Sequence, residues 1–202
     1  MIEFDYPEIR DAVAKLCAEF SSAYWQEKDR ASAYPTEFVD ALSESGCLAI
    51  LIPEEYGGSG LPLSAACAVL ETIHRSGGNG AACHAQMYTM GTLLRHGSEE
   101  QKQRFLPDIA SGQLRLQAFA VTEPDSGTDT SRITTTAVRD GDDYVINGQK
   151  VFISRAEHSD LMVLLARTGS RESGERHTDG MSVFLVDMRE AVGSGLSISA
   201  ID

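Results

Sequence analysis

The sequence is short of basic residues. Its 202 residues carry 17 Lys and Arg against 30 Asp and Glu, which gives a formal net charge of −13. Nucleic acids and anionic membrane surfaces are bound through basic surfaces, so the composition argues against both as partners. A phosphate-bearing cofactor stays possible, because a few backbone N–H groups and one or two Arg residues can bind one.

Long apolar runs are also missing. The longest, CLAILIP and LMVLLA, are far too short to span a bilayer. The first eleven residues are acidic and contain no apolar signal-peptide core, so the sequence predicts no signal peptide and a cytoplasmic location. With 42% hydrophobic and 23% charged residues, the rest of the composition is ordinary for a soluble globular protein.

Cysteine is scarce, and the four cysteines form no C-x-x-C pair. We expect buried free thiols in a reducing compartment, with Cys17 and Cys67 on apolar helix faces. The five histidines show no metal-ligand spacing. Ser154, His158 and Asp160 would be a hydrolase set only if they were farther apart and the chain had a nucleophile elbow. The sequence therefore predicts no metal site and no hydrolase triad.

Residues 1–112 have helical periodicity, with short connections between successive apolar stripes. The stripes run from Pro7 to Tyr24, from Pro35 to Gly46, from Leu63 to His74, from Cys83 to Gly97 and from Ser98 to Gly112. The apolar stripe of the third comprises Leu63, Ala66, Cys67, Leu70, Ile73 and His74. The last opens with SEEQ, which fits a capping box. The short connections predict that these helices pack against one another.

From residue 113 the pattern changes to strand-length runs divided by Asp-Gly, Asn-Gly and Gly-rich turns. The runs are LRLQAFAV, RITTTAVRDG, DYVING, KVFIS, DLMVLLART, MSVFLVD and LSISAI. LMVLLA and VFLV are apolar on both faces, which predicts central or doubly covered strands. Residues 169–180 are predicted to form a mobile loop.

Helices followed by strands predict an α+β fold in two domains. We expect an all-α helical bundle over residues 1–112 and a β-barrel-like or sandwich domain over residues 113–202. The strand pattern runs into the last residues, GSGLSISAID, so the β-domain is expected to be incomplete.

The stretch AFAVTEPDSGTDTSRITTTA, residues 118–137, interrupts an apolar run with a polar turn. Thr122 offers a hydroxyl at the strand tip, Pro124 fixes the bend, and Gly127 lets a ligand approach the backbone. Thr128 and Asp129 can cap the segment that follows. Neutral donors of this kind suit a flavin pyrimidine edge or a pyrophosphate. The alternative is a turn that binds nothing.

TEPDSGTD, followed by YVINGQKVFIS, resembles the flavin-site signature of the acyl-CoA dehydrogenases. PEEYGGSG at 53–60 and HGSEEQKQRFLPDIASGQ at 96–113 occur in the order and spacing of the same family. The resemblance covers nearly the whole chain. It implies a helical domain, a middle β-domain and a C-terminal helical domain that is missing here. It also implies an FAD-dependent oxidoreductase of fatty acid metabolism that dehydrogenates an acyl-CoA.

The resemblance assigns site residues by position. Those expected to bind the cofactor are Phe119, Val121, Thr122, Gly127, Thr128, Phe152 and Ser154. The first three match the segment at the flavin pyrimidine. The reaction removes a proton α to the thioester and sends the β-hydrogen as hydride to flavin N5. Donors at the pyrimidine stabilise the negative charge that then develops there.

The remaining site residues have roles on the faces of the cofactor. Gly127 and Thr128 match a Gly-Ser pair close to the FAD pyrophosphate and the acyl-CoA, so Thr128 is also expected to bind substrate. Phe152 and Ser154 match a Trp-x-Thr pair, an aromatic shield on one flavin face and a hydroxyl at N5. Arg155-Ala156 replaces the usual Asn-Gly, so that turn cannot adopt positive φ as cheaply.

The family's general base is a glutamate of the C-terminal helical domain, and no position here matches it. We therefore expect no catalytic residue in this chain, which alone should be inactive, and we expect Glu123 to be a structural carboxylate. The resemblance implies an acyl-CoA substrate, an electron-transferring flavoprotein as acceptor and a homotetramer or homodimer. Two alternatives stay open: a related flavin oxidase or monooxygenase, and a non-catalytic partner subunit of a heteromeric flavoenzyme.

Overall fold

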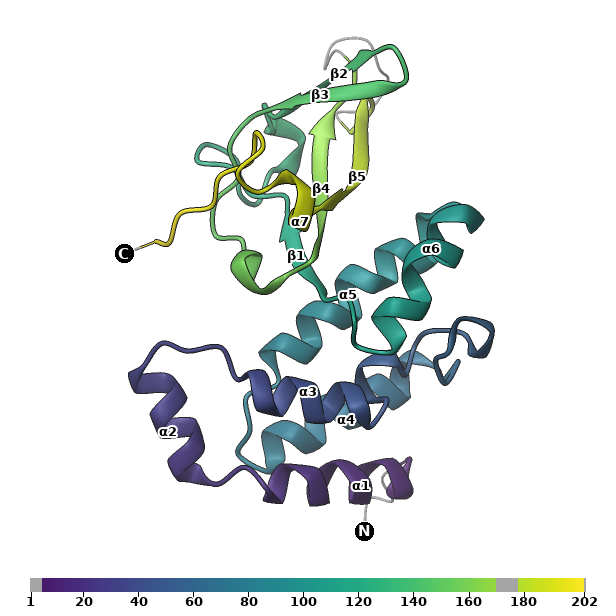
Figure 1. Cartoon of the computed structure of the whole chain (residues 1–202), viewed down its shortest axis with the longest axis vertical. Coiled ribbons are helices and arrows are strands. Elements are labelled where there is room, and N and C mark those ends of the chain that lie inside the picture. The colour runs from purple at the N-terminus through teal and green to yellow at the C-terminus, as the bar shows by residue number, and fades with distance from the viewer. Residues whose placement is uncertain (1–4, 170–177, 202) are drawn as a thin grey trace. The chain divides into compact units, whose positions relative to one another are not determined.

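A computed structural model describes residues 5–169 and 178–201 (Figure 1). The chain divides into two compact units, Met1–Arg115 and Leu116–Asp202. The first is helical and the second is built on a sheet, which confirms the α+β prediction. The contacts divide the chain after Arg115, whereas the sequence pattern placed the division after residue 112.

The helical unit contains six α-helices and two short 3-10 helices among the described residues. They are α1 (Pro7–Ala18), α2 (Ser22–Arg30), α3 (Thr36–Glu44), η1 (Cys47–Ala49), η2 (Glu54–Tyr56), α4 (Leu63–Arg75), α5 (Ala81–His96) and α6 (Glu99–Ala110). The predicted capping box opens α6. Ser98 Oγ accepts the N–H of Gln101 at 3.1 Å, and Gln101 Oε1 accepts the N–H of Ser98 at 3.0 Å.

The first apolar stripe does not form one helix, which corrects the prediction. Ser21 has an extended backbone (φ −66°, ψ 166°), and its hydroxyl accepts the N–H of Tyr24 as the N-cap of α2. The rings of Phe20 and Tyr24 nevertheless stay in contact, with centroids 5.1 Å apart. The stripe continues across the break because both rings pack against the same core, so its periodicity hid the break.

The buried face of α4 differs in part from the prediction. Ala66 and Ile73 are buried and Leu70 packs against the core, as predicted, but Leu63 (68%), Cys67 and His74 are exposed. The residues that α4 buries are Ala65, Ala66, Ala68, Val69, Thr72 and Ile73. This helix packs against α1. Ala65 and Ala66 share the buried face with Val69 and Ile73, and all of these lie in one hydrophobic core. All four cysteines are free thiols, as expected, and Cys17 and Cys83 are buried.

The β unit is organised around one central strand. Its elements are β1 (Leu116–Ala120), η3 (Thr130–Arg132), β2 (Thr136–Asp140), β3 (Asp143–Asn147), η4 (Ala156–His158), β4 (Leu161–Arg167), β5 (Met181–Asp187) and α7 (Met188–Ala191). β4 pairs with β1 in parallel and with β5 antiparallel, and β2 continues beside it at Arg167. β2 and β3 form a hairpin whose turn contains Gly141 at φ 62°. β4 is buried on both faces, as predicted.

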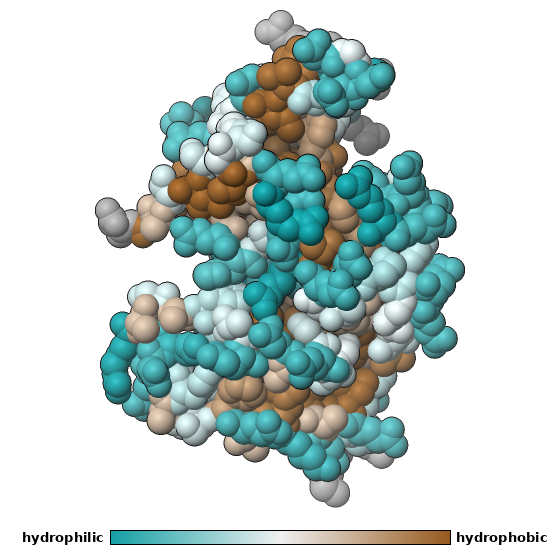
Figure 2. Space-filling view, in the orientation of Figure 1, coloured by the Kyte–Doolittle hydropathy of each residue, from teal (hydrophilic) through white to brown (hydrophobic). Residues whose placement is uncertain are grey.

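Two predicted strands are absent from the part of the chain that the structure describes. KVFIS is irregular, and LSISAI makes only an isolated bridge between Val192 and Leu196. β5 is not doubly covered either, because Val183 is 52% exposed. Apolar side chains also lie at the surface of the β2–β3 hairpin, where Val138 and Val145 are register partners (Figure 2). The predicted loop at 169–180 falls mostly on residues 170–177, outside the described residues.

Candidate functional site

The polar turn after β1 is closed by its own backbone. The N–H of Glu123 donates to the carbonyl of Ser126 at 2.9 Å, and the N–H of Ser126 donates back to the carbonyl of Glu123 at 3.1 Å. On β1 itself, Phe119 is 37% exposed between the buried Ala118 and Ala120. The strand and its turn therefore present Phe119 and the following polar residues on one connected stretch of backbone.

A second segment, residues 150–154, lies beside this turn. The N–H of Val151 donates to the carbonyl of Thr122 at 2.9 Å. Lys150 Nζ donates to the carbonyl of Val121 at 3.0 Å and to Glu123 Oε1 at 2.8 Å. The fold thus brings the candidate residues at 119–122 together with the segment that carries Phe152.

Glu123 is held inside the β unit by a complete set of donors. Its Oε2 accepts the N–H of Thr134 at 2.6 Å and the Thr134 hydroxyl at 2.8 Å, and its Oε1 accepts the N–H of Thr135 at 2.9 Å besides Lys150. Burial alone would raise the pKa of this carboxyl. The Lys150 ammonium and the hydrogen bonds from Thr135 and Thr134 outweigh burial and lower the pKa to about 2. The structure agrees with a structural carboxylate, since neither oxygen is available as a base.

Stability of the β unit should therefore depend on pH through Glu123. A carboxyl with a lowered folded-state pKa stabilises the fold above its unfolded pKa of about 4.5, and the stabilisation is lost as the pH falls through about 2. The difference corresponds to about 3 kcal/mol. Urea titrations between pH 2 and pH 6 should show this loss, and Glu123→Gln should remove it. Glu27→Gln, at an exposed carboxylate of α2, should leave it in place.

Phe152 is exposed and strained at the same time. Its ring is 73% exposed and its φ is 59°, in the left-handed region that residues with a Cβ avoid. Ser154 nearby is exposed. Arg155 also has φ 59°, so the turn adopts positive φ despite having Arg where Asn is usual. Neither burial nor backbone preference explains the conformation of Phe152.

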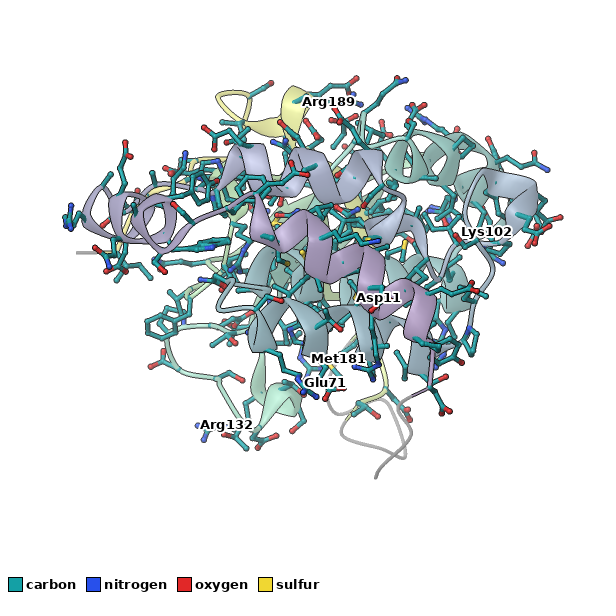
Figure 3. All side chains as sticks on the ribbon, turned by 90° about the horizontal axis from the view of Figure 1, so that it is seen from below. Asp11, Glu71, Lys102, Arg132, Met181 and Arg189 are labelled. Atoms are coloured by element: carbon teal, nitrogen blue, oxygen red, sulfur yellow. The ribbon has the colours of Figure 1, made fainter. Side chains whose placement is uncertain are left out.

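Gly127 and Thr128 follow the turn on its exposed side. A Cβ added at Gly127 would meet no atom within 4 Å, so the backbone is open to a ligand. The loop is closed by Ser126, whose hydroxyl donates to the carbonyl of Asp129 at 2.7 Å. Asp129 Oδ1 in turn caps η3 through the N–H of Ser131 at 3.2 Å, as predicted for this residue. The side chain of Arg132, at the end of η3, projects outward (Figure 3).

The groups gathered here fit a flat heteroaromatic ligand with several acceptor atoms. Phe152 offers an exposed ring, Thr122 and Ser154 offer hydroxyls, and Gly127 offers open backbone. None of these side chains is charged. A flavin nucleotide has the matching chemistry, a planar ring with acceptors along one edge and a pyrophosphate.

Sequence reasoning missed Lys150. A lysine within the largely apolar run VINGQKVFI is a signal, because a buried charge requires a partner. The identity of the partner was not readable, since Glu123 precedes it by a whole hairpin. The donors at Thr134 and Thr135 are equally invisible, because two of their three contacts with Glu123 come from the backbone.

Two family models match the chain. Residues 5–113 match the acyl-CoA dehydrogenase N-terminal domain and residues 118–202 match the acyl-CoA dehydrogenase middle domain. The chain belongs to the acyl-CoA dehydrogenase family. The helical unit and the β unit are thus the counterparts of these two domains.

Relatives of this chain include one protein named as a dehydrogenase and one named as a reductase. The chain is 36% identical over 168 residues to the acyl-CoA dehydrogenase FadE12 of Mycobacterium tuberculosis, covering 83% of this chain and 43% of that protein. It is 32% identical over 191 residues to a 3-(aryl)acrylate reductase of Clostridium sporogenes, covering 92% and 49%. The crystal structure of an acyl-CoA dehydrogenase from Geobacillus kaustophilus aligns with TM-score 0.81 and 29% identity over 92% of this chain and 50% of that one. The chain spans about half the length of the curated relatives it matches.

Proposed function

We propose that this chain carries the flavin-facing part of an FAD-dependent acyl-CoA dehydrogenase site. The observation that carries the proposal is the exposed, strained Phe152 held beside Thr122 by the contacts of Lys150 and Val151. Strain of this kind persists where the surrounding structure and a function require it. The general base comes from outside the positions that this chain matches.

Each group of residues has a role in the proposed site. FAD, when bound, supplies the hydride acceptor. The backbone at Phe119 and Val121 and the hydroxyl of Thr122 bind its pyrimidine edge and stabilise the negative charge that develops there. Phe152 covers one face and excludes water, and the Ser154 hydroxyl orients the ring at N5.

The turn after β1 completes the proposed site on the phosphate side. Gly127 and Thr128 would hold the pyrophosphate of FAD and the pantetheine of the acyl-CoA. Open backbone at Gly127 suits these groups, because a Cβ there would occupy the space that a ligand needs. The neutral hydroxyl of Thr128 suits them because a carboxylate in its place would repel the phosphates. The proposal includes a soluble homo-oligomer of fatty acid metabolism in the cytoplasm, with an electron-transferring flavoprotein as acceptor.

A second candidate function is the reduction of an α,β-unsaturated acyl group. The similarity to the 3-(aryl)acrylate reductase favours it, because the alignment with that protein covers 92% of this chain. The residues that bind and polarise the cofactor would be the same in both directions. The cofactor's potential and the electron supply decide between them.

Titration with FAD tests the proposed site. We expect saturable quenching of flavin fluorescence at one FAD per chain, and weaker binding of riboflavin, which lacks the pyrophosphate. A chain that quenches the fluorescence of neither flavin would contradict the proposal.

The reaction is then tested anaerobically with the FAD-loaded protein as its host makes it. Bleaching by a saturated acyl-CoA supports the dehydrogenase, and oxidation of the reduced protein by an unsaturated acyl compound supports the reductase. Rapid reoxidation by air instead indicates an oxidase.

Phe152→Gly should raise stability and weaken FAD binding at once. Glycine removes the left-handed strain, and the exposed ring contributes little burial, so we expect a gain of about 0.5–1 kcal/mol in the free energy of unfolding. We expect the dissociation constant for FAD to rise at least tenfold. Phe152→Ala is the matched control, because it loses the ring and keeps the strain. Denaturation and titration of both variants give the two readouts. If either variant binds FAD with the wild-type dissociation constant, Phe152 is not part of the flavin site.

A further inference from the structure

Lys150 is a buried cation that reaches two acceptors on one neighbouring segment. Its Nζ lies 3.0 Å from the carbonyl oxygen of Val121 and 2.8 Å from Glu123 Oε1. The side chains of Lys150 and Glu123 are only 9% and 3% exposed. The two acceptors belong to the residues before and after Thr122, so one ammonium group binds the chain on both sides of that residue.

Stability alone is a poor reason for this arrangement. Removing two charges from water costs about as much as their attraction returns, and an apolar pair of similar volume often stabilises a fold as well or better. A buried polar network with every group satisfied instead selects a single arrangement of the chain. Both carboxylate oxygens of Glu123 are satisfied through Lys150, Thr134 and Thr135, whereas the buried hydroxyl of Thr135 has no hydrogen-bond partner among the described residues.

Thr122 is the residue whose position this network fixes. Its own carbonyl accepts the N–H of Val151 at 2.9 Å, and the carbonyl before it and the carboxylate after it both bind Lys150. The hydroxyl of Thr122 has no hydrogen-bond partner within residues 5–169 and 178–201. The backbone of this residue is thus held on one side while its hydroxyl stays available to a ligand.

We propose that Lys150 is a positioning residue for the flavin site. By holding the Val121 carbonyl and the Glu123 carboxylate, it keeps Thr122 in register with the segment that carries Phe152 and Ser154, so that the two segments form one binding surface. The inference rests on the proposed flavin function. The contact with the Val121 carbonyl is its decisive part, because it acts directly on the backbone next to Thr122.

The double variant Lys150→Met with Glu123→Gln tests this role. Methionine keeps the bulk of the lysine stem. Glutamine keeps one acceptor oxygen, for the N–H and hydroxyl of Thr134, and loses the acceptor for the N–H of Thr135, so the double variant buries no unpaired charge at the cost of one hydrogen bond. Melting temperature reports the fold, and FAD fluorescence and the visible spectrum of the bound flavin report the site. We expect a folded protein with at least a tenfold higher dissociation constant for FAD and a shifted flavin spectrum. The matched control, Lys102→Met with Glu99→Gln at a pair whose carboxylate side chain is 71% exposed, should change neither.

The outcomes separate this inference from the proposed function. If the wild-type chain does not bind FAD, the proposed function and the inference both fail. If the wild-type chain binds and the folded double variant binds equally well with the same spectrum, only the inference fails. If the double variant melts below the assay temperature, variant and wild type are compared in a stabilising osmolyte such as sucrose. A dissociation constant for FAD at least tenfold above that of wild type there supports the inference, and equal dissociation constants overturn it.

Discussion

Lys150→Met alone lowers the free energy of unfolding of the β unit by about 3–5 kcal/mol. The variant leaves the Glu123 carboxylate buried, 3% exposed, without its cation. It also leaves the carbonyl of Val121 without the donor that Lys150 supplies. Both losses have the same sign, because a buried acceptor without a donor also costs free energy. Urea denaturation gives the total, and hydrogen exchange at the N–H of Val151 shows whether the loss falls on the junction with Thr122.

Lys102→Met provides the matched control. Lys102 donates to Glu99 at 2.9 Å, and the Lys102 side chain is 19% exposed, but the Glu99 side chain is 71% exposed. Exposed pairs of this kind contribute about 0–1 kcal/mol. If Lys150→Met lowers the free energy of unfolding no more than Lys102→Met does, water reaches the Lys150–Glu123 pair. The pair would then not hold Thr122 in place.

The division into helices and strands could be predicted from periodicity, because burial imposes a period of 3.6 on helices and of two on strands. The errors arise where a segment buries apolar side chains without forming the regular hydrogen bonds of a helix or a strand. KVFIS alternates like a strand because Ile153 packs into the core of the β unit, yet the segment is irregular. The stripe through Phe20 and Tyr24 is apolar on one side of a broken backbone. In α4 the apolar stripe places Ala66 and Ile73 correctly but also includes Leu63, which the structure leaves exposed.

The site was readable only in part. Turn chemistry alone points to Thr122 and Gly127, because a strand-end hydroxyl and an open glycine have local signatures. The role of Phe152 came from resemblance, and its positive φ has no signature in the sequence. The partnership of Lys150 with Glu123 depends on the path of the hairpin between them. Contacts set by tertiary structure leave no local pattern, so the anchoring of the site had to come from the structure.

Thr122→Val should make the bound flavin harder to reduce without harming the fold. Valine has nearly the shape of threonine, and the threonine hydroxyl has no partner among residues 5–169 and 178–201, so no buried group is left unsatisfied. We expect stability within about 0.5 kcal/mol of wild type. The backbone contact between Thr122 and Val151 is retained, so the position of the segment should not change.

The effect on the cofactor should be large, because a preorganised donor stabilises charge that is present only in the reduced state. Loss of one such donor costs roughly 2–4 kcal/mol, which for a two-electron couple is a negative shift of about 40–90 mV in the midpoint potential. Equilibration of the FAD-loaded chain with a dye of known potential measures the shift. Thr122→Ser, which keeps the hydroxyl, should stay within about 15 mV of wild type, roughly 0.7 kcal/mol. Equal potentials for the Val and Ser variants would show that the hydroxyl does not reach the flavin, and the charge at the pyrimidine would then be stabilised by backbone N–H groups alone.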